Sequence, residues 1–173
     1  MHRLSGRYNR FVVTCLKGLS MSADETSRDP TAANAAAVTP DSGGPRLLIV
    51  DDQDEVRESV ADLLEGTFHV IGVAKDGKRA IELASVLHPD VVVLDICMPV
   101  LNGIQTAEQL RDSGCPTKVV FLSMQDAPEF VEAAFTSGAL AYVLKSSLGT
   151  DLISAIRQVL EGRPFVSPAL CWH

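Results

Sequence analysis

Short apolar runs alternate with longer stretches of helical spacing along residues 46–162. The almost wholly apolar runs are 47–50, 68–73, 91–94, 119–122 and 140–144. Strands without polar alternation are typical of a sheet that is covered on both faces, usually by crossover helices. The pattern therefore predicts five buried strands in a parallel sheet.

Apolar residues between these runs recur at intervals of three and four, which is the spacing of one helical face. The stretches that show this spacing are 56–64, 80–87, 104–110, 130–135 and 152–160. Strands that alternate with helices predict an α/β fold, a three-layer sandwich in which five helices flank the sheet. In such sheets ligands bind beyond the carboxyl ends of the strands.

Polar side chains follow four of the predicted strands. They are Asp51 and Asp52 after the first, Asp95 after the third, Ser123 after the fourth and Lys145 after the fifth. Because these ends share one edge of a parallel sheet, we expect the side chains to meet in a single shallow cleft. Two like charges about 4 Å apart repel by roughly 4 kcal/mol at an effective dielectric near 20. Three carboxylates therefore need raised pKa values or a hard cation such as Mg²⁺.

A metal ion beside a carboxylate, a lysine and a hydroxyl is suited to phosphoryl transfer. The cation and Lys145 would neutralise the phosphate oxygens, and Ser123 could hydrogen-bond to one of them. An aspartate is itself a competent phosphoryl acceptor. Asp95 stands alone at a central strand end, whereas Asp51 and Asp52 are adjacent, so we predict Asp95 as the acceptor.

Four motifs carry a resemblance to the receiver domain of bacterial response regulators, and the resemblance covers residues 46–162. They are Val50-Asp51-Asp52, Leu94-Asp95-Ile96-Cys97-Met98-Pro99 with Asn102-Gly103, Leu122-Ser123 and Leu144-Lys145. The resemblance implies a flavodoxin-like strand order of 2-1-3-4-5. It also implies Mg²⁺ as the cofactor and a histidine kinase as the partner that phosphorylates Asp95.

The same resemblance implies individual roles in metal binding. Asp52 ligates Mg²⁺ directly and Asp51 mostly through water, while Asp95 is a ligand as well as the acceptor. Cys97 offers its backbone carbonyl to the metal. Ser123 moves toward the phosphoryl group.

Two further residues match the switching part of the family. Lys145 pairs with the phosphoryl group, and Tyr142 matches an aromatic position that turns inward when the hydroxyl residue moves, although a packed tyrosine is the competing interpretation. The motion would repack the surface made by the fourth helix, the fifth strand and the fifth helix. We expect that surface to bind a downstream protein or a second copy of the chain.

Two other classes of phosphate-handling protein, a phosphatase with an aspartate nucleophile and a nucleotide-binding protein with a Walker A loop, compete with the receiver interpretation. Aspartate-nucleophile phosphatases that resemble the haloacid dehalogenases carry Asp-x-Asp, whereas Cys97 stands two residues after Asp95. We therefore expect slow self-dephosphorylation and no dedicated enzyme activity on outside substrates. Residues 72–78 match the start of a Walker A loop, but Arg79 occupies the position of the metal-binding Ser or Thr, so we predict a strand followed by a helix from near Gly77.

Charge limits the possible output of the chain. The net charge is −7, and residues 46–173 hold ten Lys and Arg against eighteen Asp and Glu, or −8, which argues against DNA binding by this chain. Residues 161–170 look like the junction in regulators that continue into a LuxR-type helix-turn-helix, and we expect 163–173 to form a short tail without an effector domain. A truncated transcription regulator and a stand-alone receiver that acts through protein contacts both stay open.

Residues 1–45 are expected to be a disordered N-terminal extension and linker, because 22–45 contain few large apolar residues. Translation could start at Met1 or at Met21. No run reaches the roughly 18 apolar residues of a membrane span, and Lys17 interrupts the run that a secretory signal would need. The scattered cysteines form no C-x-x-C pair, which argues against a zinc site. We therefore expect a cytoplasmic protein without membrane contact.

Overall fold

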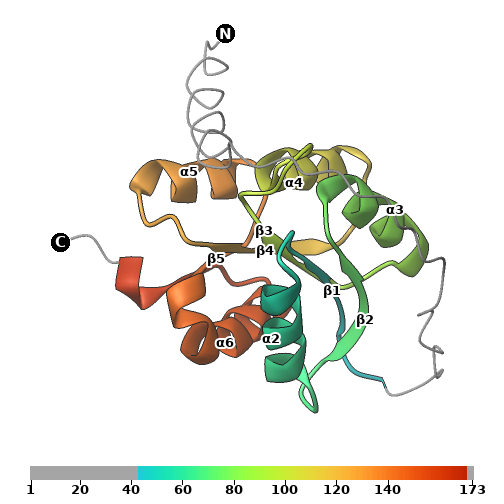
Figure 1. The fold of residues 1–173 in the computed structure, drawn as a ribbon, viewed down its shortest axis with the longest axis horizontal. Helices are drawn as coiled ribbons and strands as arrows, with labels where there is room; N and C mark the ends of the chain where they lie inside the picture. The colour runs from blue at the N-terminus through green and yellow to red at the C-terminus, as the bar shows by residue number, and fades with distance from the viewer. Residues whose placement is uncertain (1–42, 171–173) are drawn as a thin grey trace, which may run out of the picture.

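A parallel sheet lies between two layers of helices in the computed structural model, which describes residues 43–170 (Figure 1). The predicted extension 1–45 therefore lies almost entirely outside the described residues. The strands are β1 Arg46–Val50, β2 His69–Ala74, β3 Val91–Asp95, β4 Lys118–Ser123, β5 Ala141–Leu144 and β6 Phe165–Val166. The helices are α2 Asp54–Leu64, α3 Gly77–Leu87, α4 Gly103–Asp112, α5 Pro128–Thr136 and α6 Leu148–Leu160, with short 3₁₀ helices η1 Lys145–Ser147 and η2 Pro168–Leu170.

The sheet has the order β2-β1-β3-β4-β5-β6, and every neighbouring pair is parallel. The α/β fold class and the order 2-1-3-4-5 of the first five strands are therefore confirmed. The predicted count of five strands is too low by one, because β6 adds to the outer edge of β5. With only two residues, β6 is too short to produce a periodic signal in the sequence.

The side chains of alternate strand residues pack into two separate apolar cores, one on each face of the sheet. Along β1, for example, Leu48 and Val50 face one core while Leu47 and Ile49 face the other. Helices α3, α4 and α5 cover the first core, and α2 and α6 cover the second, as Figure 1 shows above and below the sheet. This double cover explains why the strands read as continuous apolar runs. Within residues 43–170, no helix has the length and apolar character needed to cross a bilayer.

The loop after β3 is held rigidly against the end of that strand. Asn102 caps the start of α4 with a capping box. The Asn102 side chain accepts a hydrogen bond from the backbone N–H of Gln105, and the Gln105 side chain accepts one from the backbone N–H of Asn102. Gly103 donates its backbone N–H to the carbonyl of Ile96 at 2.9 Å. A Cβ at Gly103 would stand 2.1 Å from the carbonyl oxygen of Asp95. Only glycine fits there, so α4 begins directly against Asp95.

We expect Gly103→Ala to lower the free energy of unfolding by about 2 kcal/mol, because the new methyl group meets backbone atoms that cannot move aside. Chemical denaturation followed by circular dichroism measures the change. Gly149→Ala, on the first turn of α6 with nothing within 4 Å of the added Cβ, is the matched control. It should be neutral or stabilising by up to about 1 kcal/mol. Equal effects of the two substitutions would contradict the close approach at Gly103.

Candidate functional site

The carboxyl ends of four strands bring the predicted residues to one edge of the sheet. Asp51 follows β1, Asp95 ends β3, Ser123 ends β4 and Lys145 follows β5. The Lys145 Nζ lies 2.7 Å from Oδ2 of Asp51 and 3.1 Å from Oδ1 of Asp95. Side chains up to 94 positions apart along the chain thus form one ionic cluster, as the geometry of a parallel sheet predicts.

Three carboxylates crowd around this lysine. Asp51 and Asp95 are buried and Asp52 is half-buried, and one oxygen from each lies within 4.8 Å of the other two. Among residues 43–170, the buried Oδ1 of Asp52 has no hydrogen-bond partner. A buried acceptor without a donor calls for a ligand, and hard cations such as Mg²⁺ prefer clustered carboxylate oxygens. The residues present therefore fit a divalent cation.

Burial has the largest effect on the pKa values of Asp52, Asp95 and Lys145, and neighbouring charges modify it. Burial raises the pKa of Asp95 from 3.8 to about 6, with Lys145 opposing the shift and Asp51 adding to it. Burial and the neighbouring Asp51 also raise the pKa of Asp52. For Lys145, burial on its own would lower the pKa, but Asp95 and Asp51 outweigh it and the net change is upward. One ammonium does not balance three carboxylates, and a bound cation would relieve the remaining repulsion.

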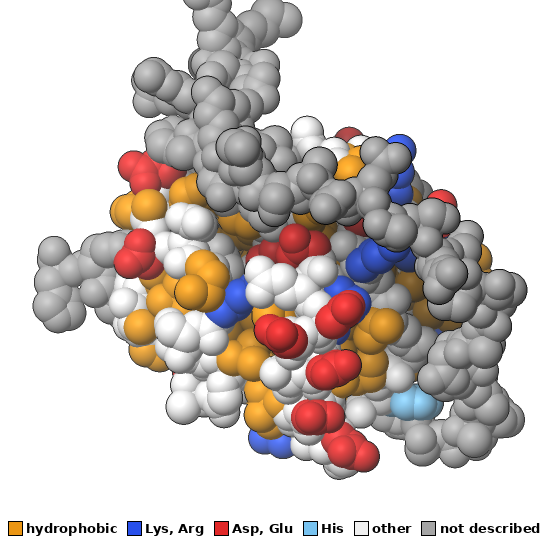
Figure 2. Space-filling view, viewed as in Figure 1, with side chains coloured by type: hydrophobic (Ala, Val, Ile, Leu, Met, Phe, Trp, Pro, Cys, Tyr) orange, Lys and Arg blue, Asp and Glu red, His pale blue; other side chains and the backbone are white. Residues whose placement is uncertain are grey.

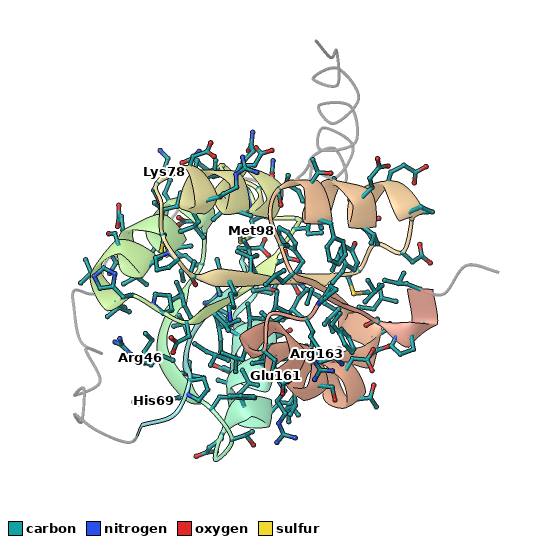
Figure 3. The ribbon with its side chains drawn as sticks, turned by 180° about the vertical axis from the view of Figure 1, so that it is seen from behind. Arg46, His69, Lys78, Met98, Glu161 and Arg163 are labelled. Carbon is teal, nitrogen blue, oxygen red and sulfur yellow. The ribbon has the colours of Figure 1, made fainter. Side chains whose placement is uncertain are left out.

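Cys97 lies in the loop that links β3 to α4, two residues after Asp95. Its neighbour Met98 is buried among the apolar side chains between the sheet and the helices (Figure 3). The contact of Gly103 with Ile96 restrains the same loop. The loop is therefore well placed for a backbone ligand, and the carbonyl role of Cys97 stays a prediction.

Ser123 and Tyr142 meet at the backbone of a single residue, Gln125. Ser123 Oγ accepts from the Gln125 N–H at 3.0 Å, and the Tyr142 hydroxyl donates to the Gln125 carbonyl at 2.8 Å. Tyr142 is fully buried, and burial raises its pKa to about 12. The tyrosine thus lies inward in this structure, with its ring in the apolar core. Its movement on switching stays a prediction.

Arg57 is a site residue that the sequence analysis did not single out. Its guanidinium donates to the backbone carbonyl of Asp51 at 2.6 Å and pairs with Asp54, and its side chain is only 15% exposed. It also lowers the pKa of Asp52, although burial and Asp51 have the larger, opposite effect. In the sequence, Arg57 is one of several charged residues in the first turns of α2, and this position alone does not indicate a contact with the acidic pair. Arg57 therefore helps to hold the loop that carries the acidic pair.

The region of the Walker A-like run has the structure that the sequence analysis predicted. Gly72 lies within β2, and α3 begins at Gly77. Asp76 caps that helix by accepting from the backbone N–H of Arg79 at 2.8 Å. A strand and a capped helix replace the open phosphate-binding loop of a nucleotide-binding protein, so this alternative is excluded.

Exposed acidic side chains line the outer face of α2, beside the cluster. The exposed acidic residues are Asp54, Glu55, Glu58 and Asp62 on α2 and Glu65 directly after it. Figure 2 shows red acidic side chains gathered in the lower centre of this face. Summed charges of one sign raise the local concentration of counter-ions near a cleft. These side chains therefore favour the approach of a cation to Asp51, Asp52 and Asp95.

Two curated relatives are similar to this chain over most of its length. The probable transcriptional regulatory protein NarL of Mycobacterium tuberculosis (strain ATCC 25618 / H37Rv) is 38% identical over 127 residues, which cover 72% of this chain and 59% of that protein. The nitrate/nitrite response regulator protein NarL of Escherichia coli (strain K12) is 35% identical over 126 residues, which cover 72% and 58%. The chain thus spans about three fifths of the length of these relatives.

Solved structures and a family model agree with this likeness. A LuxR-family two-component response regulator from Aurantimonas sp. SI85-9A1 superposes with a TM-score of 0.71 at 32% identity, over 74% of this chain and 93% of that one. The signal receiver domain of NarL from Mycobacterium tuberculosis gives 0.66 at 36% identity, over 69% and 98%. The model of the response regulator receiver domain matches residues 47–157, well over half of the chain. The chain therefore belongs to the response regulator receiver domain family.

Proposed function

We propose that this domain accepts a phosphoryl group on Asp95 from a histidine kinase of a two-component system, in the cytoplasm. The observation that carries the proposal is the Lys145 ammonium held between Asp51 and Asp95, beside the unpartnered buried oxygen of Asp52. Asp51, Asp52, Asp95 and the carbonyl of Cys97 would hold Mg²⁺. The family membership and the acidic cluster both support this assignment.

The chemistry follows from the groups at the strand ends. A carboxylate oxygen of Asp95 attacks the phosphorus and a P–O bond forms while the P–N bond to the donor histidine breaks. The electron pair of that bond stays on the nitrogen, and the imidazole leaves neutral because its other ring nitrogen already carries a proton. With a pKa of about 6, Asp95 is mostly ionised near pH 7, which the attack requires. Lys145 neutralises the charge on the phosphoryl oxygens, and Ser123 donates a hydrogen bond to one of them. Bound Mg²⁺ supplies the remaining charge neutralisation.

The phosphoryl group then changes the balance of contacts at this edge. It adds a charge of roughly −1.5 to −2 near neutral pH, which attracts Lys145 and Ser123. Ser123 would leave the Gln125 N–H, and Tyr142 hydrogen-bonds to the carbonyl of the same residue. The surface that repacks is made by α5, β5 and α6, the predicted fourth helix, fifth strand and fifth helix. We propose that it binds a downstream protein or a second copy of the chain.

The relatives suggest the process in which this switch takes part. The relative from Mycobacterium tuberculosis is named a probable transcriptional regulatory protein, and the one from Escherichia coli a nitrate/nitrite response regulator protein. We propose that the chain acts in transcriptional control through protein contacts of the α5–β5–α6 surface, because the −8 charge of residues 46–173 disfavours contact with DNA. The domain would shed its phosphoryl group slowly and would not act as an enzyme on outside substrates.

We expect Asp95→Asn to abolish phosphorylation by phosphoramidate in the presence of Mg²⁺, because the amide is not a nucleophile. Intact-protein mass spectrometry measures the gain of one phosphoryl group. Asp112→Asn, on the exposed end of α4, is the matched control and should be phosphorylated like the wild type. Phosphorylation of the Asp95→Asn variant would place the acceptor elsewhere.

Stability should depend on pH through the raised pKa of Asp95. The folded state binds a proton more tightly than the unfolded state, so without Mg²⁺ the free energy of unfolding falls as pH rises from 3.8 to about 6. A shift of this size corresponds to at most about 3 kcal/mol. Urea titrations across this range measure the fall, which Mg²⁺ should reverse near pH 7.

Asp95→Asn is the control for the pH dependence, since it removes the titrating group. This variant should unfold with a smaller pH dependence than the wild type and should be more stable than it near pH 7 without Mg²⁺. An Asn variant whose stability falls with pH as steeply as the wild type would show that another group causes the dependence.

A further inference from the structure

Residues 165–170, here called the β6 segment, extend the sheet beyond the region 47–157 that the family model matches. The chain leaves α6 through a turn at Gly162, near the ion pair of Glu161 and Arg163 (Figure 3). The Phe165 N–H donates to the carbonyl of Leu140 at 3.0 Å, and the Ser167 N–H donates to the carbonyl of Tyr142 at 2.9 Å. The strand then stops, because the chain turns into η2, where the Leu170 N–H donates to the carbonyl of Ser167 at 2.8 Å.

Beyond the backbone hydrogen bonds of β6, the Ser167 hydroxyl makes the next hydrogen bond to β5. Its oxygen accepts from the Leu144 N–H at 3.1 Å, and its proton is donated to Oδ2 of Asp151 at 2.7 Å. Ser167 is fully buried, so its bond with Leu144 is shielded from water, whereas its bond with Asp151 is part-buried. Asp151 lies in the first turn of α6. One hydroxyl group thus joins the ends of β5 and β6 to the start of α6.

These contacts end one residue away from the ionic cluster. Leu144 directly precedes Lys145, whose ammonium contacts Asp51 and Asp95. Leu170 is also buried, in the same apolar core as Tyr142 and Leu144. A buried amide that loses its acceptor destabilises the structure, so the strand end before Lys145 depends on Ser167.

We propose that Ser167 is a positioning residue for Lys145, and that the β6 segment docks more tightly when Asp95 carries a phosphoryl group. This inference rests on the proposed function. A phosphoryl group draws Lys145 inward and restricts the end of β5, which favours the bonds from Leu144 through Ser167 to Asp151. Coupling between two sites is reciprocal, so a docked segment must favour the phosphorylated site by the same factor. The β6 segment would thereby carry the state of Asp95 to the residues that follow α6.

The first test compares Ser167→Ala with the wild type in the full 173-residue chain. At saturating Mg²⁺, we expect the rate constant of phosphorylation by phosphoramidate to fall about fivefold or more, because Lys145 is no longer held where it neutralises the phosphoryl oxygens. The affinity for Mg²⁺ should not fall, because Ser167 does not touch the three carboxylates and a displaced Lys145 opposes the cation less. Ser167→Thr keeps the hydroxyl and should restore most of the rate.

Ser137→Ala is the matched control. Ser137 is equally buried, but its hydroxyl bonds only to the carbonyl of Ala134 in its own helix, so the rate should not change. Equal losses in Ser167→Ala and Ser137→Ala, or a parallel loss of Mg²⁺ affinity, would reduce Ser167 to a general structural role and overturn the proposal.

The second test uses the wild-type chain and does not depend on a variant that folds. Hydrogen exchange is measured with Mg²⁺ alone and with Mg²⁺ plus beryllofluoride, a mimic of the phosphoryl group. We expect the amides of Leu144, Phe165, Ser167 and Leu170 to exchange about fivefold more slowly with the mimic. Asp95→Asn should show no slowing.

Fluorine NMR of bound beryllofluoride separates the possible failures. If the wild type binds the mimic while exchange in the β6 segment is unchanged or faster, the β6 proposal is overturned and the proposed function stands. If the wild type does not bind the mimic at all, the proposed function fails and the β6 proposal fails with it.

Discussion

The ionic cluster at the carboxyl edge of the sheet contains more buried negative charge than positive charge. Lys145 contacts Asp51 and Asp95 closely, yet Asp52 keeps a buried oxygen without a hydrogen bond within residues 43–170. Burial of unbalanced charge is costly, and the raised pKa of Asp95 is the direct sign of that cost. A ligand that binds at this edge must therefore carry positive charge, or must carry an anionic group that pairs with the Lys145 ammonium.

The rest of the fold keeps that unfavourable cluster in place. Two apolar cores, one on each side of the sheet, stabilise strands whose ends carry the charged residues. The close approach of Gly103 to the carbonyl of Asp95 fixes the loop on one side, and Arg57 holds the loop of Asp51 on the other. Stability supplied by the cores is thus combined with buried, mutually repelling carboxylates at the site.

Two short sets of hydrogen bonds lead from the cluster toward the α5–β5–α6 surface. One joins Ser123 and Tyr142 through the backbone of Gln125, and the other joins Leu144 to Asp151 through Ser167. Both meet on β5, the strand that ends one residue before Lys145. A change in the position of Lys145 can therefore affect the helix packed on each side of this strand, which gives a physical basis for a two-state surface.

The sequence alone determined the five apolar strands, the helices between them and the polar residues at the strand ends, because each leaves a local pattern of hydrophobicity. The strand order came from the resemblance, since periodicity does not specify which strands are neighbours. Only the tertiary structure decided the pairing of β6 and the contacts of Gln125 and Ser167. Two of these contacts join a backbone atom to a side chain 17 or 23 positions away, and no local spacing of residue types records such a meeting.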